Sequence, residues 1–362
     1  MGVKAFPMTA YLVGKGLFRD NPFALVDAGC RGGIEECWRV FGDDLRAMGI
    51  DPMVAEIKRL QSAETNPNVK YVAGFVGLPN DHPMVQSREG RGPWGNNPWH
   101  RLSTAWAKTL MAGRVSNLES LSKDNRWREK ELAEGSRRLG LSTLVVENQM
   151  ETVDFIKIDI DGDDLYALCS CEEIIESHDV LGFKLEVNFF GTDCETDNTF
   201  HNTDRYMRRQ GFDLVDLTVR KYSRRALPAP FAQPKPAGGI WGVPYQGDAV
   251  YVRDLARSPA DCSMAVVKIL KLAAIYEVCG LPDCAAEVLQ AFREQLSEVV
   301  DVDRALDLIT PRHKGKKMSY QQYIESFSAD PTSFYPRQRS GIEKSMRVVT
   351  ARVKALVRRC MS

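Results

Sequence analysis

The sequence predicts an α/β fold, in which helices cover both faces of a mainly parallel sheet and an all-helical region follows. Three observations support this fold class. Strand and helix patterns alternate through about the first 255 residues, which is typical of βα units. A glycine-rich turn follows the first strand pattern. After residue 257 the strand patterns stop and long helices take their place, so we divide the chain into residues 1–257 and 258–362.

Strand and helix patterns follow one another in the order that such a sheet requires. Apolar runs predict strands over residues 23–27, 45–50, 69–76, 154–162, 182–189, 212–217 and 248–252. Amphipathic patterns predict helices over residues 35–41, 54–62, 163–177 and 203–210. Residues 227–245 are rich in proline and predict an ordered loop.

A long insertion separates the third and fourth predicted strands, at about residues 78–142. It begins with Gly, Pro, Asn and Trp and continues as a charged helix pattern over residues 118–139. Trp94, Trp99 and Trp106 are suited either to stacking on sugar rings or to packing in a core. A detour of this length usually covers a site or contacts a partner.

Composition restricts the cellular setting and the class of ligand. The formal net charge of zero gives no general attraction to nucleic acid. Nine scattered cysteines without a C-x-x-C pair predict reduced thiols and a cytoplasmic location. The opening residues do not resemble a signal peptide, and no run of about 18 apolar residues predicts a membrane span.

The most informative motif is the turn after the first strand, Asp27-Ala28-Gly29-Cys30-Arg31-Gly32-Gly33. Gly29 and Gly33 allow a ligand to approach the backbone closely. Asp51 ends a second apolar run 24 residues after Asp27, where a carboxylate can accept hydrogen bonds from both ribose hydroxyls. The D-x-G-x-x-x-G pattern suits S-adenosylmethionine, which has no phosphate, better than a dinucleotide. We therefore expect these two acids and two glycines to bind S-adenosylmethionine, although the same turn also occurs in other α/β domains.

A second motif carries a family resemblance. Residues 153–165 read Val-Asp-Phe-Ile-Lys-Ile-Asp-Ile-Asp-Gly-Asp-Asp-Leu. This segment resembles D-F-x-K-x-D-V-E-G-x-E, the diagnostic segment of the FkbM family of methyltransferases. The turn at Asp27 is similar to D-x-G-A-N-x-G of that family, Ile50-Asp51-Pro52 to its F-E-P, and Leu185-Glu186-Val187 to its fifth-strand glutamate segment. Residues 247–252 are similar to the final strand of the family, so the resemblance spans about residues 20–255.

The resemblance implies a class I, Rossmann-like fold with seven strands, the last of them antiparallel. It also implies S-adenosylmethionine as the cofactor and O-methylation of a hydroxyl on a sugar, a glycolipid or another natural product. Asp159, inside the diagnostic segment, is counted with the cofactor-binding residues. Three positions depart from the family pattern, because Arg31 replaces an asparagine and the shorter Asp161 and Asp163 replace glutamates.

A hydroxyl acceptor needs a base that takes its proton during attack on the methyl group. His201 is our first choice, because it lies in the polar segment after the fifth strand, close to where acceptors bind in this fold. Asp161 and Glu186 are the rival catalytic residues, although Asp161 is equally suited to capping a helix and Glu186 to anchoring a backbone. His100, in the insertion, is a further alternative. The acids at 159–164 also suit a hard cation, but the glycines of a calcium loop are missing, so no metal is predicted.

The region after residue 257 predicts helices over residues 263–279 and 283–299, joined by Gly280-Leu281-Pro282. Residues 342–360 form a basic amphipathic helix pattern. Such a helix packs on its own domain or on a second subunit, or it rests on an anionic membrane surface. The expected partners are therefore a hydroxylated acceptor, a membrane surface contacted peripherally, or a second copy of the chain, and no nucleic acid is expected.

Two other function classes stay open at this point. One is a methyltransferase that acts on protein or nucleic acid and uses the insertion and the basic tail for docking. The other is a binding or scaffold protein that keeps the fold without turnover. The intact pattern at Asp27, Gly29, Gly33 and Asp51 favours an active cofactor site over a scaffold.

Overall fold

The computed structural model describes residues 6–86, 138–160, 162–224, 226–233 and 238–335. The chain divides into two compact units, residues 1–305 and 306–362. The helices that follow residue 257, as far as residue 305, therefore belong to the same unit as the sheet. Several predicted features lie outside the described residues: the charged helix up to residue 137, the three tryptophans of the insertion, His100, Asp161 and the basic tail.

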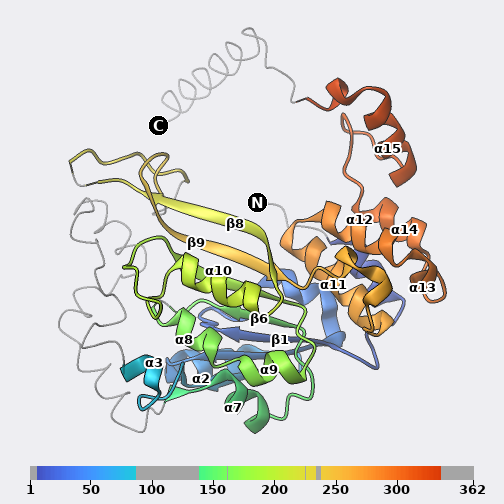
Figure 1. The fold of residues 1–362 in the computed structure, drawn as a ribbon. Helices are drawn as coiled ribbons and strands as arrows, with labels where there is room; N and C mark the ends of the chain where they lie inside the picture. Colours follow the sequence, from blue (N-terminus) through green and yellow to red (C-terminus); the bar gives the residue numbers. More distant parts are fainter. Residues whose placement is uncertain (1–5, 87–137, 161, 225, 234–237, 336–362) are drawn as a thin grey trace, which may run out of the picture. The chain divides into compact units, whose positions relative to one another are not determined.

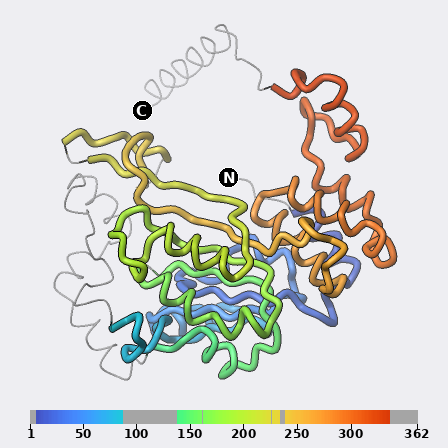
Figure 2. The backbone as a smooth tube through the Cα atoms, in the orientation of Figure 1, coloured from blue at the N-terminus to red at the C-terminus, as the bar shows by residue number. Residues whose placement is uncertain are grey.

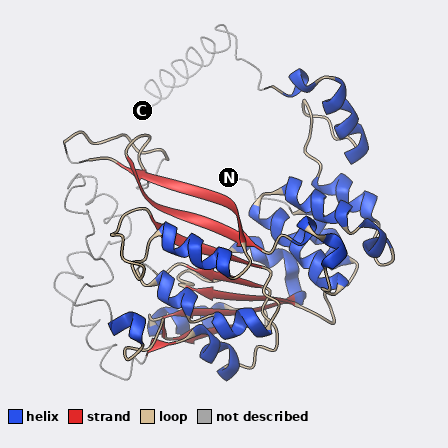
Figure 3. Cartoon of the chain, in the orientation of Figure 1, coloured by secondary structure: helices blue, strands red, loops and turns tan. Residues whose placement is uncertain are grey.

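The strands that the structure describes form a seven-stranded sheet in the order β3-β2-β1-β6-β7-β9-β8, with helices on both sides (Figures 1 and 3). The pairs from β3 to β7 are parallel, and β9 is antiparallel to both of its neighbours. Because the chain runs outward from β1 through β2 and β3 and then returns to pair β6 with β1, the order reverses there. Ligands of open α/β sheets bind at the carboxyl ends of strands at such a reversal. The class I methyltransferase fold predicted from the sequence is confirmed.

The bounds of the elements follow the predicted order closely. The sheet contains β1 (Phe23–Ala28), β2 (Leu45–Asp51), β3 (Val69–Ala73), β6 (Phe155–Ile158), β7 (Gly182–Asn188), β8 (Asp213–Tyr222) and β9 (Val243–Val252). The helices of the first unit are α1 (Pro7–Gly14), η1 (Glu36–Asp44), α2 (Val54–Ala63), α3 (Pro83–Gln86), α7 (Leu141–Glu147), α8 (Asp164–Cys169), α9 (Glu172–Ser177), α10 (Phe200–Arg209), η3 (Leu255–Arg257), η4 (Pro259–Asp261), α11 (Val266–Cys279), α12 (Pro282–Ala291) and α13 (Arg293–Ser297). Helix α14 (Val302–Ile309) spans the boundary between the two units.

Several predicted elements differ from the structure. The third strand ends at Ala73, and β4 (Phe75–Val76) pairs instead with β5 (Arg138–Leu139) in a separate two-stranded sheet, so residues 138–139 are not helical. The helix after β1 is a 3₁₀ helix with a kink at Gly42, where φ is +53°. Strands β8 and β9 extend further than predicted, because they pair with each other as far as Tyr222 and Val243.

Two predicted helices are divided: residues 283–299 into α12 and α13, and the helix after β6 into α8 and α9. The backbone N–H of Leu141 donates to the Ser170 hydroxyl at 2.9 Å, and the N–H of Ser142 donates to the Ser170 carbonyl at 3.1 Å. The hydroxyl and the carbonyl of Ser170 thus both accept hydrogen bonds from the start of α7, and the helix after β6 is interrupted at this residue. The division therefore results from a long-range contact that the local sequence does not reveal.

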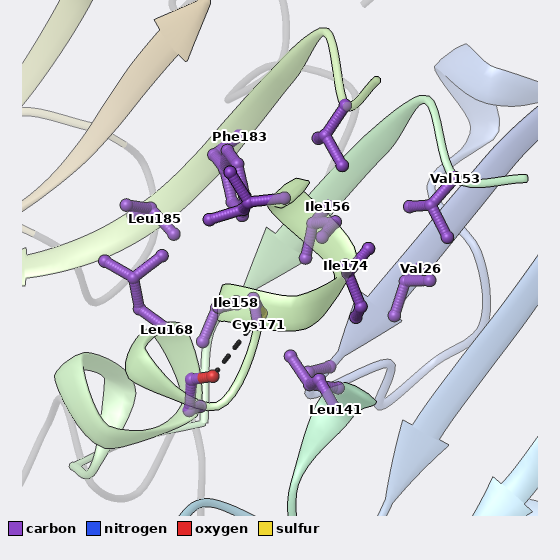
Figure 4. Packing of buried hydrophobic residues seen from close by; sticks show 14 of the residues in the cluster. Val26, Leu141, Val153, Ile156, Ile158, Leu168, Cys171, Ile174, Phe183 and Leu185 are labelled. Atoms are coloured by element: carbon purple, nitrogen blue, oxygen red, sulfur yellow. Dashed lines mark hydrogen bonds between the residues drawn. The ribbon is translucent and has the colours of Figure 1, made fainter. Parts of the chain in front are cut away.

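One face of the sheet carries the main hydrophobic core (Figure 4). The residues that alternate toward this face, such as Val26, Ile156, Ile158, Phe183 and Leu185, pack against α7, α8, α9 and α10. Apolar side chains at every second strand position and at helical spacing produce this packing, as the sequence patterns require. The core holds the carboxyl ends of β1, β6 and β7 in fixed positions.

The opposite face begins with aromatic packing and ends with charges. Phe23 stacks on Phe41 with ring centroids 4.2 Å apart, and Trp38 lies against both Phe23 and Phe155. Further along the same strands the side chains on this face are charged, beginning with Asp27 and Lys157. The strands on this face therefore change from an apolar end to a polar end, and the polar end is the carboxyl edge.

A buried ionic cluster joins α11 to the amino-terminal side of the sheet. The Asp154 carboxylate accepts hydrogen bonds from the backbone N–H of Ala24 and from the Lys271 ammonium, each at 2.8 Å. Lys268 Nζ lies 2.8 Å from the other carboxylate oxygen of Asp154. The Lys271 ammonium also donates to the Pro22 carbonyl and to Asn21. Helix α11 is thus connected to β1 and to the start of β6 through one carboxylate.

The second unit contains α15 (Tyr320–Ala329) and η5 (Pro331–Phe334). Helix α15 begins with a capping box, in which the Ser319 hydroxyl accepts the N–H of Gln322 and the Gln322 side chain accepts the N–H of Ser319. Phe334 packs on His313, Tyr323 and Phe327. These contacts give the described part of this unit a small aromatic centre of its own.

Candidate active site at the carboxyl edge of the sheet

The glycine turn follows β1 directly and depends on Gly29. The φ angle of Gly29 is +87°, in the left-handed region that favours glycine. A Cβ at this position would lie 1.8 Å from the backbone oxygen of Asp159, which follows β6. The steric requirement for glycine therefore comes from the neighbouring strand, and it brings the turns after β1 and β6 into contact.

Position 33 requires glycine for a different reason. Its φ is +100°, and a Cβ would lie 3.2 Å from a methyl group of Leu60 on α2 and 3.4 Å from the Tyr71 hydroxyl on β3. The turn is closed by a hydrogen bond of 2.8 Å from the N–H of Gly33 to the carbonyl of Cys30. Gly33 thus lets the turn lie against α2 and β3.

Asp51 is the last residue of β2 and is buried. Its Oδ1 accepts the backbone N–H of Met53 at 2.9 Å, which fixes the direction of the carboxylate. The N–H groups of Gly29 and Cys30 both donate to the Ile50 carbonyl, at 2.8 and 3.2 Å. The structure therefore places Asp51 beside the glycine turn, as the sequence predicts for two neighbouring parallel strands.

Asp27 lies in β1 just before the turn and forms a buried ion pair with Lys157 of β6. The Lys157 ammonium donates to Asp27 Oδ1 at 2.9 Å. Asp27 Oδ2 is buried and has no hydrogen-bond partner among the described residues. Burial raises the pKa of Asp27 and the Lys157 ammonium opposes that rise, whereas the pKa of Lys157 is raised by its acidic neighbours despite burial. A buried carboxylate oxygen without a donor is suited to accept one from a ligand.

Asp159 follows β6 and lies closer to solvent than Asp27. Its Oδ2 is 4.0 Å from the Lys157 ammonium, so Lys157 lies between the two acids. On the next strand the Lys184 ammonium donates to both carboxylate oxygens of Glu35, at 2.8 and 3.1 Å. Both lysines are thus paired with acids from the β1 side of the sheet. The structure brings together four of the predicted cofactor residues, Asp27, Gly29, Asp51 and Asp159, and places Gly33 at the end of the same turn.

The loop after β6 is organised by Asp164, the first residue of α8. Its buried carboxylate accepts the backbone N–H groups of Ile160 and Gly162, at 2.9 and 3.1 Å. Burial raises the pKa of Asp164 to about 6, although these hydrogen bonds favour the charged form. Asn198, from the loop after β7, donates to the Gly162 carbonyl at 2.6 Å and to Asp164 at 3.2 Å. Asp164 and Asn198 therefore hold the loops after β6 and β7 against each other.

Glu186 lies within β7, two residues before the strand ends, rather than at its tip. Its carboxylate accepts a hydrogen bond of 2.9 Å from Arg220 of β8, and Arg220 also pairs with Asp248 of β9. Burial disfavours the charge of Arg220, but the two carboxylates outweigh this and raise its pKa. The structure thus places Glu186 in an ion cluster that spans three strands. The ion pair with Arg220 holds the Glu186 carboxylate in a fixed position.

His201 is the second residue of α10, and its side chain is exposed. Helix α10 follows the loop after β7, which folds on itself through hydrogen bonds of Thr192 to the Asp197 carboxylate at 2.6 and 2.8 Å. His201 is therefore at the beginning of the helix that leaves the carboxyl edge, accessible to solvent. The structure does not pair it with a described acid.

Sequence reasoning missed three residues of this region. Lys157 was part of the diagnostic segment but was not assigned a contact, although its alternation with Asp159 places it on the same side of the strand. Asp164 falls on the last glutamate of the family pattern, and its backbone donors Ile160 and Gly162 are local. Asn198 carries no local signal, because it lies 34 residues from Asp164 in the chain. Asp163, which we compared with a family glutamate, falls on a variable position of the pattern, and it pairs with Arg138 at 2.9 Å.

Residues 113–214 match the family model of the methyltransferase FkbM domain. This segment of the chain is similar to the FkbM methyltransferase domain. The match includes β6, β7 and the loops after them, and it begins after the glycine turn and Asp51. S-adenosylmethionine is the methyl donor of this domain family, in agreement with the predicted cofactor. No curated protein matches the sequence.

Several solved structures are similar to this chain at low sequence identity. A magnesium protoporphyrin IX methyltransferase from Synechocystis PCC 6803 with bound SAH is 12% identical, with a TM-score of 0.29 over 68% of this chain and 80% of that one. The cofactor-bound protein Rv0187 from MTB is 14% identical, with a TM-score of 0.30 over 70% and 82%. A TehB-like methyltransferase from Corynebacterium glutamicum is 13% identical, with a TM-score of 0.26 over 69% and 89%. The fold assignment therefore rests on the strand order itself.

In the described part of the chain, no helix is both long and apolar enough to cross a membrane. No group of three His, Cys, Asp or Glu side chains suited to hold a metal ion occurs among the described residues. The eight cysteines in the described ranges are all free thiols.

Proposed function

We propose that the protein transfers a methyl group from S-adenosylmethionine to a hydroxyl of a sugar, a glycolipid or another natural product. The proposal is supported by the FkbM domain match together with the arrangement at the carboxyl edge. The observation that carries it is the position of buried Asp51 beside the Gly29 turn, at the point where the strand order reverses. This is the arrangement that holds a nucleoside across two parallel strands.

The residues present fit this cofactor. S-adenosylmethionine, when bound, supplies a methyl group made electrophilic by the sulfonium. Asp51 is placed to accept hydrogen bonds from ribose hydroxyls, and its carboxylate is already oriented by the N–H of Met53. Asp27 offers a buried oxygen without a donor among the described residues, which suits an ammonium group. Asp159 adds a further negative charge on the same side of Lys157.

We propose His201 as the base. It is exposed at the start of α10, so an acceptor can reach the imidazole, and the imidazole can take a proton from the attacking hydroxyl. Glu186 is buried and held by Arg220, so acting as a base would require that ion pair to open. Asp161 stays a prediction, because it lies outside the described residues.

The cofactor site is tested by replacing Asp51 with asparagine and titrating S-adenosylhomocysteine calorimetrically. Asn keeps an oxygen for the N–H of Met53, so the fold should be preserved and the loss should fall on the ligand. We expect binding to weaken by about 1–3 kcal/mol, which is the usual cost of losing hydrogen bonds to a charged group. Asp43→Asn is the matched control, because exposed Asp43 lies just before the opposite end of the same strand.

Equal affinities of the Asp51→Asn and Asp43→Asn proteins would refute the assigned cofactor site. A wild-type protein that binds no S-adenosylhomocysteine at millimolar concentration would favour the scaffold function instead.

The acceptor class is tested with S-adenosylmethionine that carries a labelled methyl group and a panel of glycans and glycolipids. We expect label in the carbohydrate that resists mild alkali, because a methyl ether is stable there whereas a methyl ester is hydrolysed. His201→Ala should lower kcat by about 100-fold or more, the usual contribution of a general base, without changing cofactor affinity. Label released by alkali, or label found only in protein or nucleic acid, would overturn hydroxyl methylation.

A further inference from the structure

Strands β8 and β9 continue past the end of the parallel sheet. Asn188, the last residue of β7, pairs with Gln246 of β9. The residues of β9 before Gln246 therefore extend beyond β7 at the carboxyl edge, and they pair there with the end of β8. We call the described residues 219–224, 226–233 and 238–245 the hairpin extension. Figures 1 and 2 show it projecting beyond the other strands. It leaves the sheet on the same edge as the cofactor residues.

The base of the hairpin extension is firmly packed. Tyr222 and Tyr245 are buried, with ring centroids 5.1 Å apart, and Phe190 from the loop after β7 lies 4.4 Å from Tyr245. Further out, the N–H of Gly239 donates to the Lys221 carbonyl at 2.7 Å. The N–H of Ile240 donates to the Pro230 carbonyl at 3.0 Å. Backbone hydrogen bonds therefore hold the outer part as well as the base.

The outer part nevertheless exposes large apolar side chains. Leu227 is 70% exposed, Ile240 is 56% exposed and Trp241 is 46% exposed. Val219, at the start of the extension, is exposed as well. Single exposed apolar residues are ordinary, but this set lies on one ordered hairpin whose aromatic base is already buried. These side chains are available to a partner without any unfolding of the base.

The charge of the same segment is entirely of one sign. The whole chain has 48 basic and 48 acidic residues, yet residues 217–247 contain five basic residues and no Asp or Glu. Arg220 is neutralised by Glu186 and Asp248, whereas Lys221 and Arg224 are exposed. An exposed tryptophan and aliphatic residues beside lysine and arginine are the combination that lies in the interface of an anionic membrane.

We propose that the hairpin extension docks on the surface of an anionic lipid bilayer. The apolar side chains enter the region between headgroups and acyl chains, while Lys221 and Arg224 contact the lipid phosphates. Exposed Leu227 and Ile240 favour a bilayer over a nucleic acid, which offers bases for stacking but no aliphatic layer. The inference deepens the proposed function and rests on it in one respect: docking would bring the carboxyl edge to the hydroxyls of a glycolipid headgroup.

The test is sedimentation of the full chain with vesicles of phosphatidylcholine alone or with about one third phosphatidylserine. We expect binding to the anionic vesicles that weakens on adding salt, because the basic contribution is screened. The Ile240→Ser/Trp241→Ser protein should bind the vesicles at least about tenfold more weakly than the wild type. The Lys221→Gln/Arg224→Gln protein should lose most of the preference for anionic vesicles. Val54→Ser/Val146→Ser and Lys58→Gln/Lys70→Gln are matched controls, because these residues are exposed on other elements.

Three outcomes would overturn the proposal. The first is absence of binding to either kind of vesicle. The second is binding that the hairpin variants do not weaken, which would place the membrane contact elsewhere in the chain. The third is loss of polyuridylate binding in Lys221→Gln/Arg224→Gln while vesicles are not bound, which would make the surface a nucleic-acid site.

Docking and catalysis can fail separately in this experiment. Each hairpin variant is also titrated with S-adenosylhomocysteine, and its affinity should equal that of the wild type, since none of its mutated residues is an assigned cofactor residue. Vesicle binding without S-adenosylhomocysteine binding would refute the proposed function and leave docking intact. S-adenosylhomocysteine binding without vesicle binding would do the reverse.

Discussion

Replacing Asp154 with alanine is expected to lower the free energy of unfolding by about 3–5 kcal/mol, the usual effect of removing one partner from a buried ion pair. Asp154 is fully buried and is the charged partner of both Lys268 and Lys271. Burial lowers the pKa of Lys271, and the Asp154 carboxylate opposes this, so its removal leaves an ammonium without compensation. The backbone N–H of Ala24 also loses its acceptor. Urea denaturation followed by circular dichroism measures the loss.

The matched control for this experiment is Asp261→Ala, which removes an exposed carboxylate. That change should stay within about 0.5 kcal/mol of the wild type, as surface substitutions usually do. If Asp154→Ala is no less stable than Asp261→Ala, the ionic cluster does not connect α11 to the sheet. A double variant, Asp154→Asn/Lys271→Met, should recover part of the loss, because it removes the acid and one of the two cations together.

The second large effect is expected at Gly29, where alanine should lower stability by about 3–5 kcal/mol and abolish binding of S-adenosylhomocysteine. The added Cβ would lie 1.8 Å from the Asp159 carbonyl oxygen, so the turns after β1 and β6 must separate. Because Asp27 and Asp159 flank that contact, the separation also displaces the acids of the proposed cofactor site. Thermal unfolding and calorimetric titration measure the two effects.

Gly32→Ala is a close control for Gly29→Ala. Gly32 has a similar φ of +93°, but a Cβ there would meet no described atom within 4 Å. The Gly32→Ala protein should therefore lose about 1–2 kcal/mol through backbone strain, without a collision between the new Cβ and a neighbouring atom. Equal losses in the two variants would mean that backbone strain, and not contact with Asp159, makes glycine necessary at position 29.

The sequence predicts the fold because its signals are local and repeated. Alternating apolar residues place Val26 and Ile156 in the core, and the turn at Gly29 marks the edge where the strand order reverses. The patterns predict less well where a distant contact decides the local structure. The helix after β6 is interrupted at Ser170, which accepts a hydrogen bond from the start of α7. Residues of β5 form a strand because they pair with β4.

In the candidate site, too, local motifs predict some residues, whereas distant contacts determine others. Asp27, Gly29 and Asp51 follow from motif spacing, and the structure brings them together. The pairing of Asp27 with Lys157, however, joins residues 130 positions apart, and only the strand register specifies it. Glu186 is a further case, because its sequence position gives no sign of Arg220, which reaches it from two strands away.

The ionic cluster of α11 has a consequence for the order in which the chain folds during synthesis. Lys271 follows Asp154 by 117 residues, and Ala24, which donates to the same carboxylate, precedes Asp154 by 130. The strands near Asp154 can pair as they leave the ribosome, but their buried acid receives its cations only after α11 has been translated. Contacts of such long separation form slowly and late. The ribosome must therefore synthesise well past the last strand before the first strands reach their final environment.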